Sequence, residues 1–332
     1  MTDLSVPTSS SSDPRAYRAD LPALRLVSAS GADAIDFLHG QLTQDVQGLA
    51  GDNAALAGYC TAKGRLLATL VMWRPDAGAA DAGSDAPRLR ALVRADVVEP
   101  LLKRLRMFVL RAKVTLSVAA AQVAGVWTDG DPAALDAAAG GTLPRQAWHR
   151  AELSSGTWVA APSGRGHRWW WIATDEQRQA AAGLANVLGP GNAETWQAAD
   201  LAAGLPWVGV ATQDLFIPQT VNLDLIGGVS FTKGCYPGQE VVARSHYRGT
   251  VKRRMAYGIV PGQPAAAIAA GSDIYDADKP NEPCGRVVDA AGDVDAAILF
   301  ETTLDTLSAG HLRLGGADGP AIRTQPLPYA LQ

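Results

Sequence analysis

The sequence predicts an α+β protein that ends in a separate, small all-β domain. Within about the first 250 residues, short apolar strands alternate with amphipathic helices, and tight hairpins join several of the strands, which is typical of antiparallel sheets covered by helices. From residue 251 onward, short strands separated by Pro- and Gly-rich turns dominate, which is typical of a small β-barrel or sandwich. A chain of 332 residues is long enough for two or three such domains.

The first part is expected to begin with a strand at residues 23–27, followed by a helix whose apolar residues recur at helical spacing. A β-hairpin follows, because the apolar runs 54–60 and 65–73 are joined by a short turn that contains Gly64. A second amphipathic helix is expected at residues 97–108. Further strands of this region are expected at residues 89–93, 113–119, 122–128, 158–160 and 168–174.

Two more helices are expected near residues 175–188 and 194–203, the second ending at Gly204. Residues 1–20 are expected to be a disordered tail, because the N-terminus is polar and rich in Ser, Thr and Pro and has no features of a secretory signal. Residues 75–87 are patternless and predict an exposed loop. The C-terminal strands are expected at residues 254–260, 273–275, 285–290, 295–300 and 311–314.

Composition excludes several classes of protein. The net charge of −4 gives no general attraction to phosphate backbones, so a direct nucleic-acid contact is not expected without a local basic patch. No apolar run is long enough to span a bilayer, and a cytoplasmic location with no membrane association is expected. The three cysteines and five histidines are too scattered for a disulfide framework or a metal site, so free thiols and no permanently bound metal are expected.

The densest functional signal surrounds Cys235. This cysteine lies two residues after Lys233 and just before a helix expected at residues 239–247 that stops at Gly249. A nearby cation and a helix N-terminus both favour a thiolate. Against this, a lone cysteine is usually a small buried hydrophobe and Pro-Gly is usually only a turn. Spacing alone therefore leaves a reactive-thiol role and a structural role both open.

The neighbours of Cys235 suit a ligand. Gly234 and Gly238 remove side chains on either side and allow close approach to the backbone. Gln239 offers donors and acceptors for the edge of a heterocycle, and Glu240 falls in the first helical turn, where a carboxylate is favoured.

Residues 233–240, Lys-Gly-Cys-Tyr-Pro-Gly-Gln-Glu, resemble the signature of the YgfZ-type folate-binding proteins, which are relatives of the glycine-cleavage T-protein (aminomethyltransferase). The resemblance covers nearly the whole chain. Its further segments are residues 37–45, 59–65, 196–206, 216–219, 222–224, 244 and 247–249.

The resemblance implies a T-protein-like folate-binding fold of two α+β parts with antiparallel sheets plus a C-terminal β-barrel. Residues 21–250 would form the folate-binding region, as two intertwined subdomains, and residues 251–332 the barrel. Tetrahydrofolate or a derivative would bind in the centre, with Cys235 as functional thiol and Lys233 beside it. The implied folate-binding residues are Asn222, Gly234, Tyr236, Gly238, Gln239, Glu240, Arg244, Gln41, Thr43 and Asp45. For the last three, a capped helix end is an equally good interpretation.

The chain departs from the T-protein at two places. Arg94 stands where that family has an asparagine before its acidic residue, and neither Asp96 nor Glu99 falls in register, so both are better interpreted as first-turn helix carboxylates. Residues 167–172 replace the segment whose glutamate holds the pterin, and their tryptophans are interpreted as core packing.

Three functions follow from these observations. The first, implied by the resemblance, is a folate-binding accessory protein that acts through Cys235 in iron–sulfur cluster assembly or repair, with client enzymes, including tRNA-modifying enzymes, or the assembly machinery as partners. The second is a folate-dependent aminomethyl or one-carbon transferase with Asp45, Asp96 or Glu99 as base. The third is an RNA-binding module that uses the basic residues of segment 251–254 with Arg244 and Arg248.

Overall fold

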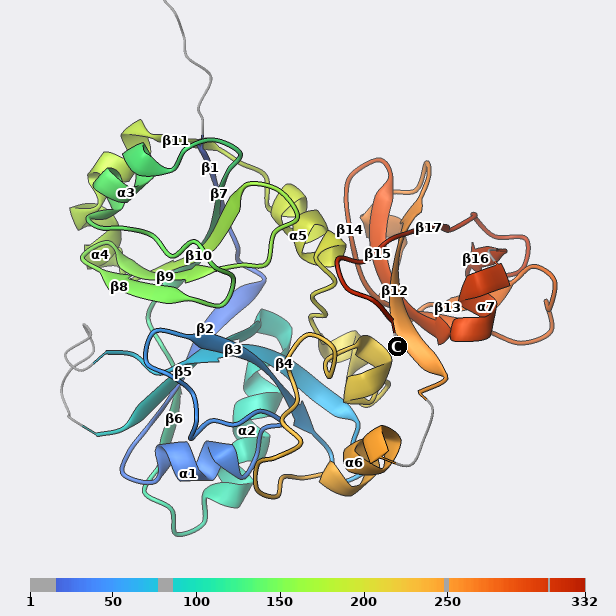
Figure 1. Ribbon diagram of the computed structural model, residues 1–332, viewed down its shortest axis with the longest axis horizontal. Coiled ribbons are helices and arrows are strands. Elements are labelled where there is room, and N and C mark those ends of the chain that lie inside the picture. The colour runs from blue at the N-terminus through green and yellow to red at the C-terminus, as the bar shows by residue number, and fades with distance from the viewer. Residues whose placement is uncertain (1–15, 77–85, 248–250, 310, 332) are drawn as a thin grey trace, which may run out of the picture.

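The computed structural model describes residues 16–76, 86–247, 251–309 and 311–331, and places their strands in three sheets, one in each of three parts of the molecule (Figure 1). Much of the loop expected at residues 75–87, namely residues 77–85, lies outside the described residues. Within the described ranges, none of the helices combines the length and the apolar character needed to cross a lipid bilayer.

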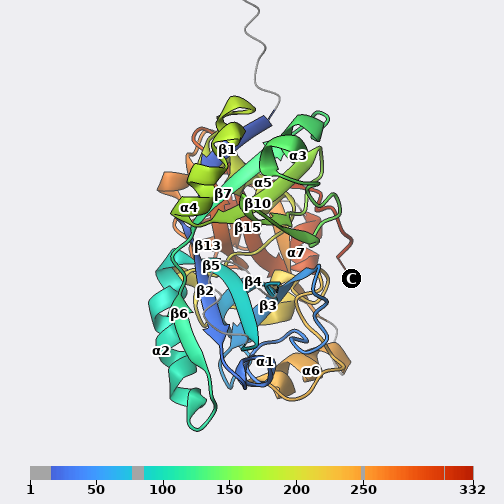
Figure 2. The same ribbon diagram turned by 90° about the vertical axis from the view of Figure 1, so that its left-hand side faces the viewer.

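The first part is a five-stranded antiparallel sheet in the order β3-β4-β5-β2-β6. Two helices, α1 (Ala34–His39) and α2 (Val98–Val109), pack on it through a shared hydrophobic core. As Figure 2 shows, α2 lies along the outer edge of this part. The predicted hairpin and both predicted helices are therefore confirmed. The strands are β2 (Leu24–Ser30), β3 (Ala54–Cys60), β4 (Leu66–Trp73), β5 (Arg88–Arg94) and β6 (Thr115–Val118).

The second part is a six-stranded sheet in the order β11-β1-β7-β10-β9-β8. Its tryptophans are core residues, as predicted, because Trp169, Trp170 and Trp171 are each at most 1% exposed and alternate between two hydrophobic clusters. The helices are α3 (Ala133–Ala139) and α4 (Asp175–Ala180). The strands are β1 (Ala16–Asp20), β7 (Gln122–Thr128), β8 (Arg150–Leu153), β9 (Gly156–Ala160), β10 (His167–Ala173) and β11 (Leu188–Pro190).

Two predictions for this part were wrong. Residues 16–20 are not a disordered tail, because β1 pairs antiparallel with β7 and parallel with β11; residues 1–15 lie outside the described residues. The long helix expected at residues 175–188 ends early, at Ala180. A 3₁₀ turn and β11 follow it, because Gly183 and the Gly189-Pro190 pair disfavour a continued helix while residues 188–190 find a partner in β1.

The third part is a curled six-stranded sheet in the order β16-β13-β14-β15-β12-β17 around its own hydrophobic core. The predicted C-terminal β domain is thus present, with helix α7 (Leu304–Ala309) beside it. The strands are β12 (Arg253–Val260), β13 (Asp273–Asp276), β14 (Gly285–Ala291), β15 (Ala296–Thr303), β16 (Leu312–Leu314) and β17 (Arg323–Gln325).

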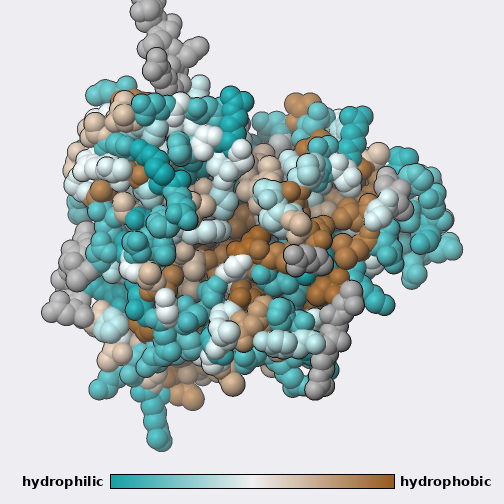
Figure 3. Space-filling view, viewed as in Figure 1, coloured by the Kyte–Doolittle hydropathy of each residue, from teal (hydrophilic) through white to brown (hydrophobic). Residues whose placement is uncertain are grey.

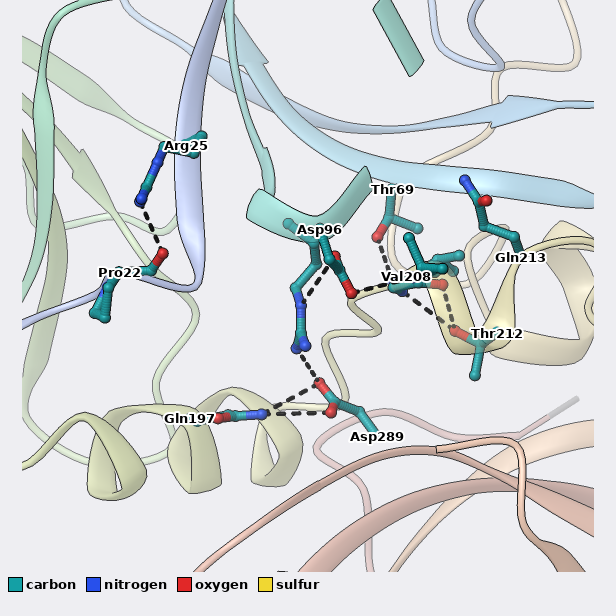
Figure 4. Close-up of polar contacts among 12 residues, drawn as sticks. Pro22, Arg25, Thr69, Asp96, Gln197, Val208, Thr212, Gln213 and Asp289 are labelled. Atoms are coloured by element: carbon teal, nitrogen blue, oxygen red, sulfur yellow. Dashed lines mark hydrogen bonds and ion pairs between the residues drawn. The ribbon is translucent and has the colours of Figure 1, made fainter. Parts of the chain in front are cut away.

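The three parts meet at a polar junction beside helix α5 (Ala193–Ala202), which Figure 4 shows in close-up. Arg94, at the end of β5, donates from Nη1 to Asp289 Oδ2 of the third part at 3.2 Å. Gln197 on α5 donates to the same carboxylate at 3.3 Å. Burial raises the pKa of Asp289 to about 6, against the opposing effect of Arg94. Arg94 and Gln197 therefore tie the first part and helix α5 to the third part.

Candidate functional site

The thiol of Cys235 lies at the surface. It is exposed and free, and it lies in the loop before helix α6 (Gln239–Tyr247), which forms as predicted at the lower end of the molecule in Figure 1. The predicted end of this helix at Gly249 lies outside the described residues. Tyr236 beside it is 6% exposed and anchors the loop in the protein. The loop therefore presents the cysteine outward while its neighbour is held in place.

Lys233 binds the end of helix α1. Its Nζ donates to the carbonyl oxygens of Leu42 at 2.7 Å and Gln44 at 3.4 Å, and also to that of His39. Burial lowers the pKa of Lys233 to about 8, although the nearby Asp45 and Cys235 act in the opposite direction. The lysine thus joins the cysteine loop to residues 39–45, whereas the sequence suggested only that it was a cation close to the thiol.

Gly238 serves packing rather than ligand approach. It has φ +81, and a Cβ placed on it would come within 2.5 Å of the Cα and N atoms of Gly64. The space that the sequence suggested for a ligand is therefore filled by the turn of the β3–β4 hairpin. Gly234 differs, because the nearest atom to an added Cβ is His39 Nε2 at 3.6 Å.

The remaining motif residues of α6 face solvent. Glu240 and Arg244 are both exposed and form an i,i+4 ion pair of 2.5 Å with one another. Gln239 is half-buried at the start of the helix. These three side chains do not line the cavity described below.

Two other residues predicted to bind folate use their hydrogen-bonding groups inside the protein. Thr43 is fully buried, where its Oγ1 donates to the Gly228 carbonyl at 2.6 Å and accepts from the Gly58 N–H at 2.7 Å. Asn222 is also fully buried, and its side-chain amide exchanges two hydrogen bonds with the backbone of Met255. Their hydrogen bonds hold loops and strands together, so neither is placed to contact a ligand.

A cavity of about 400 Å³ opens between the first and second parts, a size typical of small-molecule sites. It is bordered by the loop that follows α1, by the start of β3, and by the segments just before β8 and after Asn222. A band of apolar residues crosses the middle of the molecule, where the three parts meet (Figure 3). The lining residues are Gln44, Asp45, Gly48, Leu49, Ala50, Asn53, Ala54, Ala55, Leu56, Ala147, Trp148, His149, Ile226 and Gly227.

Trp148 is the most unusual of these lining residues. Its φ is +70, a left-handed conformation that a large side chain rarely adopts. The backbone is held there from both sides: Trp148 N donates to Ala160 O at 2.8 Å, and Ala54 N donates to Trp148 O at 2.6 Å. The two sheets thus fix an indole ring at the cavity wall.

Asp45 is the one predicted site residue that lines this cavity. Its Oδ1 accepts from the Gly48 N–H at 2.9 Å and lies 3.3 Å from His39 Nδ1. Burial, followed by the nearby Lys233, lowers the pKa of His39, so this imidazole is neutral at pH 7. Gln41, four residues before Asp45, is half-buried, and its Oε1 has no hydrogen-bond partner among the described residues.

The lining of the cavity has groups of the kinds that a pterin ring requires. A flat pterin needs an aromatic or apolar wall and acceptors for its N–H groups. Trp148, Leu49 and Ile226 supply the wall. Asn53 supplies a buried Oδ1 that no group within the described residues hydrogen-bonds, and Asp45 supplies a carboxylate.

The other candidate sites are weakened by the structure. Asp96 and Glu99 are both exposed, and Asp96 accepts a hydrogen bond from the Val210 N–H at 3.1 Å, so neither is a buried base. In the basic run 251–254, Arg254 is buried and pairs with Asp224 at 2.7 Å, while Arg253 pairs with Glu301. Arg248, the other residue of that basic cluster, lies outside the described residues.

The sequence missed Trp148, Asn53 and His39. No motif marks the first two, because a strained backbone and an unpaired amide oxygen appear only once distant segments meet. His39 lies within the segment that resembles the family, next to Gln41, but its contacts with Asp45 and Gly234 depend on the fold.

The fold is that of the glycine-cleavage T-protein. The aminomethyltransferase T of the glycine cleavage system from Bartonella henselae aligns with 95% of this chain and 86% of its own, with a TM-score of 0.70 at 16% identity. The expected T-protein-like fold is therefore confirmed. No protein-family model matches the chain.

The relatives that match by sequence define a narrower group of proteins than the fold does. The chain is 31% identical over 323 residues to the tRNA-modifying protein YgfZ of Escherichia coli (strain SMS-3-5), which covers 92% of this chain and 91% of that protein. It is 29% identical over 310 residues to the protein of the same name from Yersinia pseudotuberculosis (serotype O:1b), covering 92% and 90%. The chain belongs to the YgfZ family.

Proposed function

We propose that this protein binds a reduced folate in the cavity beside Trp148 and acts in the cytoplasm as an accessory factor in tRNA modification through Cys235. The observation that carries the proposal is a chain of contacts: the cavity is lined by Gln44 and Asp45, and the loop that holds them is bound by Lys233, two residues from the exposed thiol. Relatives of the chain are named tRNA-modifying proteins. A folate bound in the cavity would therefore contact the loop that Lys233 connects to the thiol.

The chemistry of the thiol supports work on iron–sulfur clusters of client enzymes. A thiolate is the usual protein ligand of such clusters, and one thiolate cannot hold a cluster alone. The other two cysteines do not complete a set, since Cys60 is buried in the first part and Cys284 is half-buried in the third. Exposure of Cys235 allows a client protein or the assembly machinery to supply the remaining ligands. Assembly or repair of a cluster that belongs to another protein is the role that fits.

Different residues of the chain would bind the folate and position the thiol. Trp148 and Asn53 would hold the pterin, Asp45 would accept a hydrogen bond from it, and Lys233 would transmit loop position to Cys235. The folate supplies a one-carbon carrier when bound. No permanently bound metal is needed for this role.

The test separates the cavity from the thiol. Purified wild type, Trp148→Leu, Asn53→Leu and Cys235→Ala are titrated with tetrahydrofolate species, and each variant is also scored for the activity of iron–sulfur tRNA-modifying enzymes in a deletion background. We expect the first two variants to bind folate at least tenfold more weakly. Cys235→Ala is expected to bind folate normally but to leave client activity at the deletion level. Cys284→Ala is the matched control, and normal client activity with Cys235→Ala would contradict the proposal.

A folate-dependent aminomethyl or one-carbon transferase is the second candidate. Asp45 is the acid that favours it, because its carboxylate lines the cavity and is linked to the neutral His39. Transfer of a one-carbon unit from a methylene donor by the purified protein, abolished by Asp45→Asn, is the result that this candidate requires.

A further inference from the structure

The C-terminal end of helix α2 carries an unpaired positive charge that no function proposed so far uses. Five basic residues lie within eleven positions, and the segment 100–128 contains no acidic residue although the whole chain has a net charge of −4. None of the five forms an ion pair with any residue that the structure describes. We call this surface the α2 tip; its basic residues are Lys103, Arg104, Arg106, Arg111 and Lys113.

The fold turns these side chains outward. The apolar stripe of α2, which includes Leu101, Leu102 and Leu105, is buried against the first sheet. The opposite side of the helix is therefore the exposed one, and all of the basic residues except Arg104 are exposed. Figures 1 and 2 both show the turn after α2 projecting at the lower end of the molecule, the end that also carries α6.

Apolar side chains are interleaved with the charges. Phe108 is 43% exposed, Met107 59% and Leu110 88%, and Leu110 has a φ of +43. Exposed rings and flat apolar surfaces among cations are the arrangement on which unstacked bases rest while phosphates contact the cations.

A small hollow adjoins the tip. It has a volume of about 220 Å³ and lies between α2 and the first sheet, with Lys103 and Arg104 at its edge and Met107 and Tyr59 in its wall. Arg104 and Tyr59 both line the hollow, and the nearby guanidinium acts to lower the pKa of the Tyr59 hydroxyl, although burial raises it overall. A cavity of this size, with basic residues at its edge, suits one base whose phosphate lies outside.

We propose that the α2 tip binds single-stranded or looped RNA, with the cations on consecutive phosphates and a base at Phe108 or in the hollow. This inference rests on the proposed role in tRNA modification and names the surface that meets the RNA. It revises the expectation from net charge, because the local patch that such contact needs is present here and not at residues 251–254, where Arg253 and Arg254 are paired with acids.

A membrane surface fits less well. A helix that lies on a bilayer inserts a continuous apolar face, and the apolar stripe of α2 is already buried in the protein. Only one turn of exposed apolar side chains remains for the lipid. Anionic vesicles are therefore the competing partner that the experiment includes.

The experiment compares two charge reversals of equal size in the full-length protein. The tip variant is Lys103→Glu/Arg106→Glu/Arg111→Glu, and the control variant is Lys252→Glu/Lys279→Glu/Arg323→Glu, whose three residues are also exposed. Binding of a fluorescent tRNA anticodon stem-loop is followed by anisotropy from 50 to 200 mM salt. Wild type and control are expected to lose affinity with a log–log slope of about −2, the value for roughly three phosphate contacts on single-stranded RNA.

The tip variant is expected to bind at least tenfold more weakly than the control at 50 mM salt and to lose most of this slope. Met107→Ala/Phe108→Ala is expected to weaken binding about tenfold with the slope unchanged, since stacking does not depend on counterions. Equal affinity of the tip and control variants overturns the proposal. So does binding of phosphatidylserine vesicles, but not RNA, by the wild type.

Folate titration of the same variants distinguishes the RNA-binding proposal from the folate-binding proposal. The tip variant is expected to bind folate as the wild type does. If the wild type binds folate and supports client activity but does not bind RNA, only the proposal for the α2 tip is overturned. If the wild type binds RNA normally but does not bind folate, the proposed function of the cavity is overturned and the proposal for the α2 tip stands.

Discussion

Gly64 and Gly238, 174 positions apart in the sequence, lie in direct backbone contact: a Cβ on Gly238 would be 2.5 Å from Gly64 Cα, and a Cβ on Gly64 would be 2.9 Å from Val241 Cβ. The turn of the β3–β4 hairpin therefore fits against the start of α6 without intervening side chains. This contact fixes where the loop with Cys235 leaves the body of the protein.

Gly238→Ala is expected to destabilise the protein by about 2–4 kcal/mol, because the residue has φ +81 and the added methyl group meets rigid backbone. Gly234→Ala is the matched control in the same loop, since its added methyl group makes only ordinary contact with His39. Urea unfolding of the two variants measures the difference. Equal free energies of unfolding would show that the hairpin turn does not restrain α6.

Lys233→Met is expected to lower the free energy of unfolding by about 1–3 kcal/mol, because the carbonyls of His39, Leu42 and Gln44 lose their shared donor. Folate affinity should fall as well, since Gln44 and Asp45 line the cavity. Lys63→Met removes an exposed lysine and is expected to change neither quantity. Unfolding titrations and folate titrations of both variants provide the check, and a Lys233→Met protein with wild-type values in both would contradict this role.

Asp289→Asn is expected to flatten the pH dependence of stability. The folded pKa of Asp289 is raised to about 6, so the folded state keeps this proton between roughly pH 4 and 6 while the unfolded state has lost it. The free energy of unfolding of the wild type should therefore fall as pH rises through that window, by about 2–3 kcal/mol relative to the variant. Urea unfolding at pH 4.5 and 7.5 tests the sign: a wild type that gains stability relative to Asp289→Asn on going to pH 7.5 would refute it.

Alkylation should distinguish the three cysteines. Cys235 is exposed, whereas burial raises the pKa of Cys60 to about 12 and also raises that of Cys284. Iodoacetamide at pH 7.5 is expected to label Cys235 first, Cys284 much more slowly, and Cys60 only after unfolding. Mass spectrometry of peptides from the labelled native protein gives the order, and early labelling of Cys60 would mean that the first core opens readily.

Local patterns were sufficient for most of the fold. The hairpin at residues 54–73, helix α2, helix α6 and the alternating tryptophans of β10 each follow from periodicity and turn residues within the segment itself. Strand β1 could not be predicted this way, because its short sequence is only extended where β7 and β11 are available as partners. The same limit applies to the site: the cysteine loop is readable, but the roles of Gly238, Thr43 and Asn222 depend on partners far along the chain.

The position of β1 in the second sheet also affects how the protein can fold during synthesis. During translation, residues 16–20 emerge first, yet their two neighbours in the sheet, β7 and β11, are made about 100 and 170 residues later. The whole first sheet, from β2 to β6, is synthesised in between and has its own core, so it can fold on the ribosome while β1 waits unpaired. A strand whose backbone groups stay unpaired for that time is a site for mispairing between nascent chains. This protein would therefore be most vulnerable to aggregation during synthesis, while the second sheet is incomplete. The vulnerability would not come from a weak contact in the folded state.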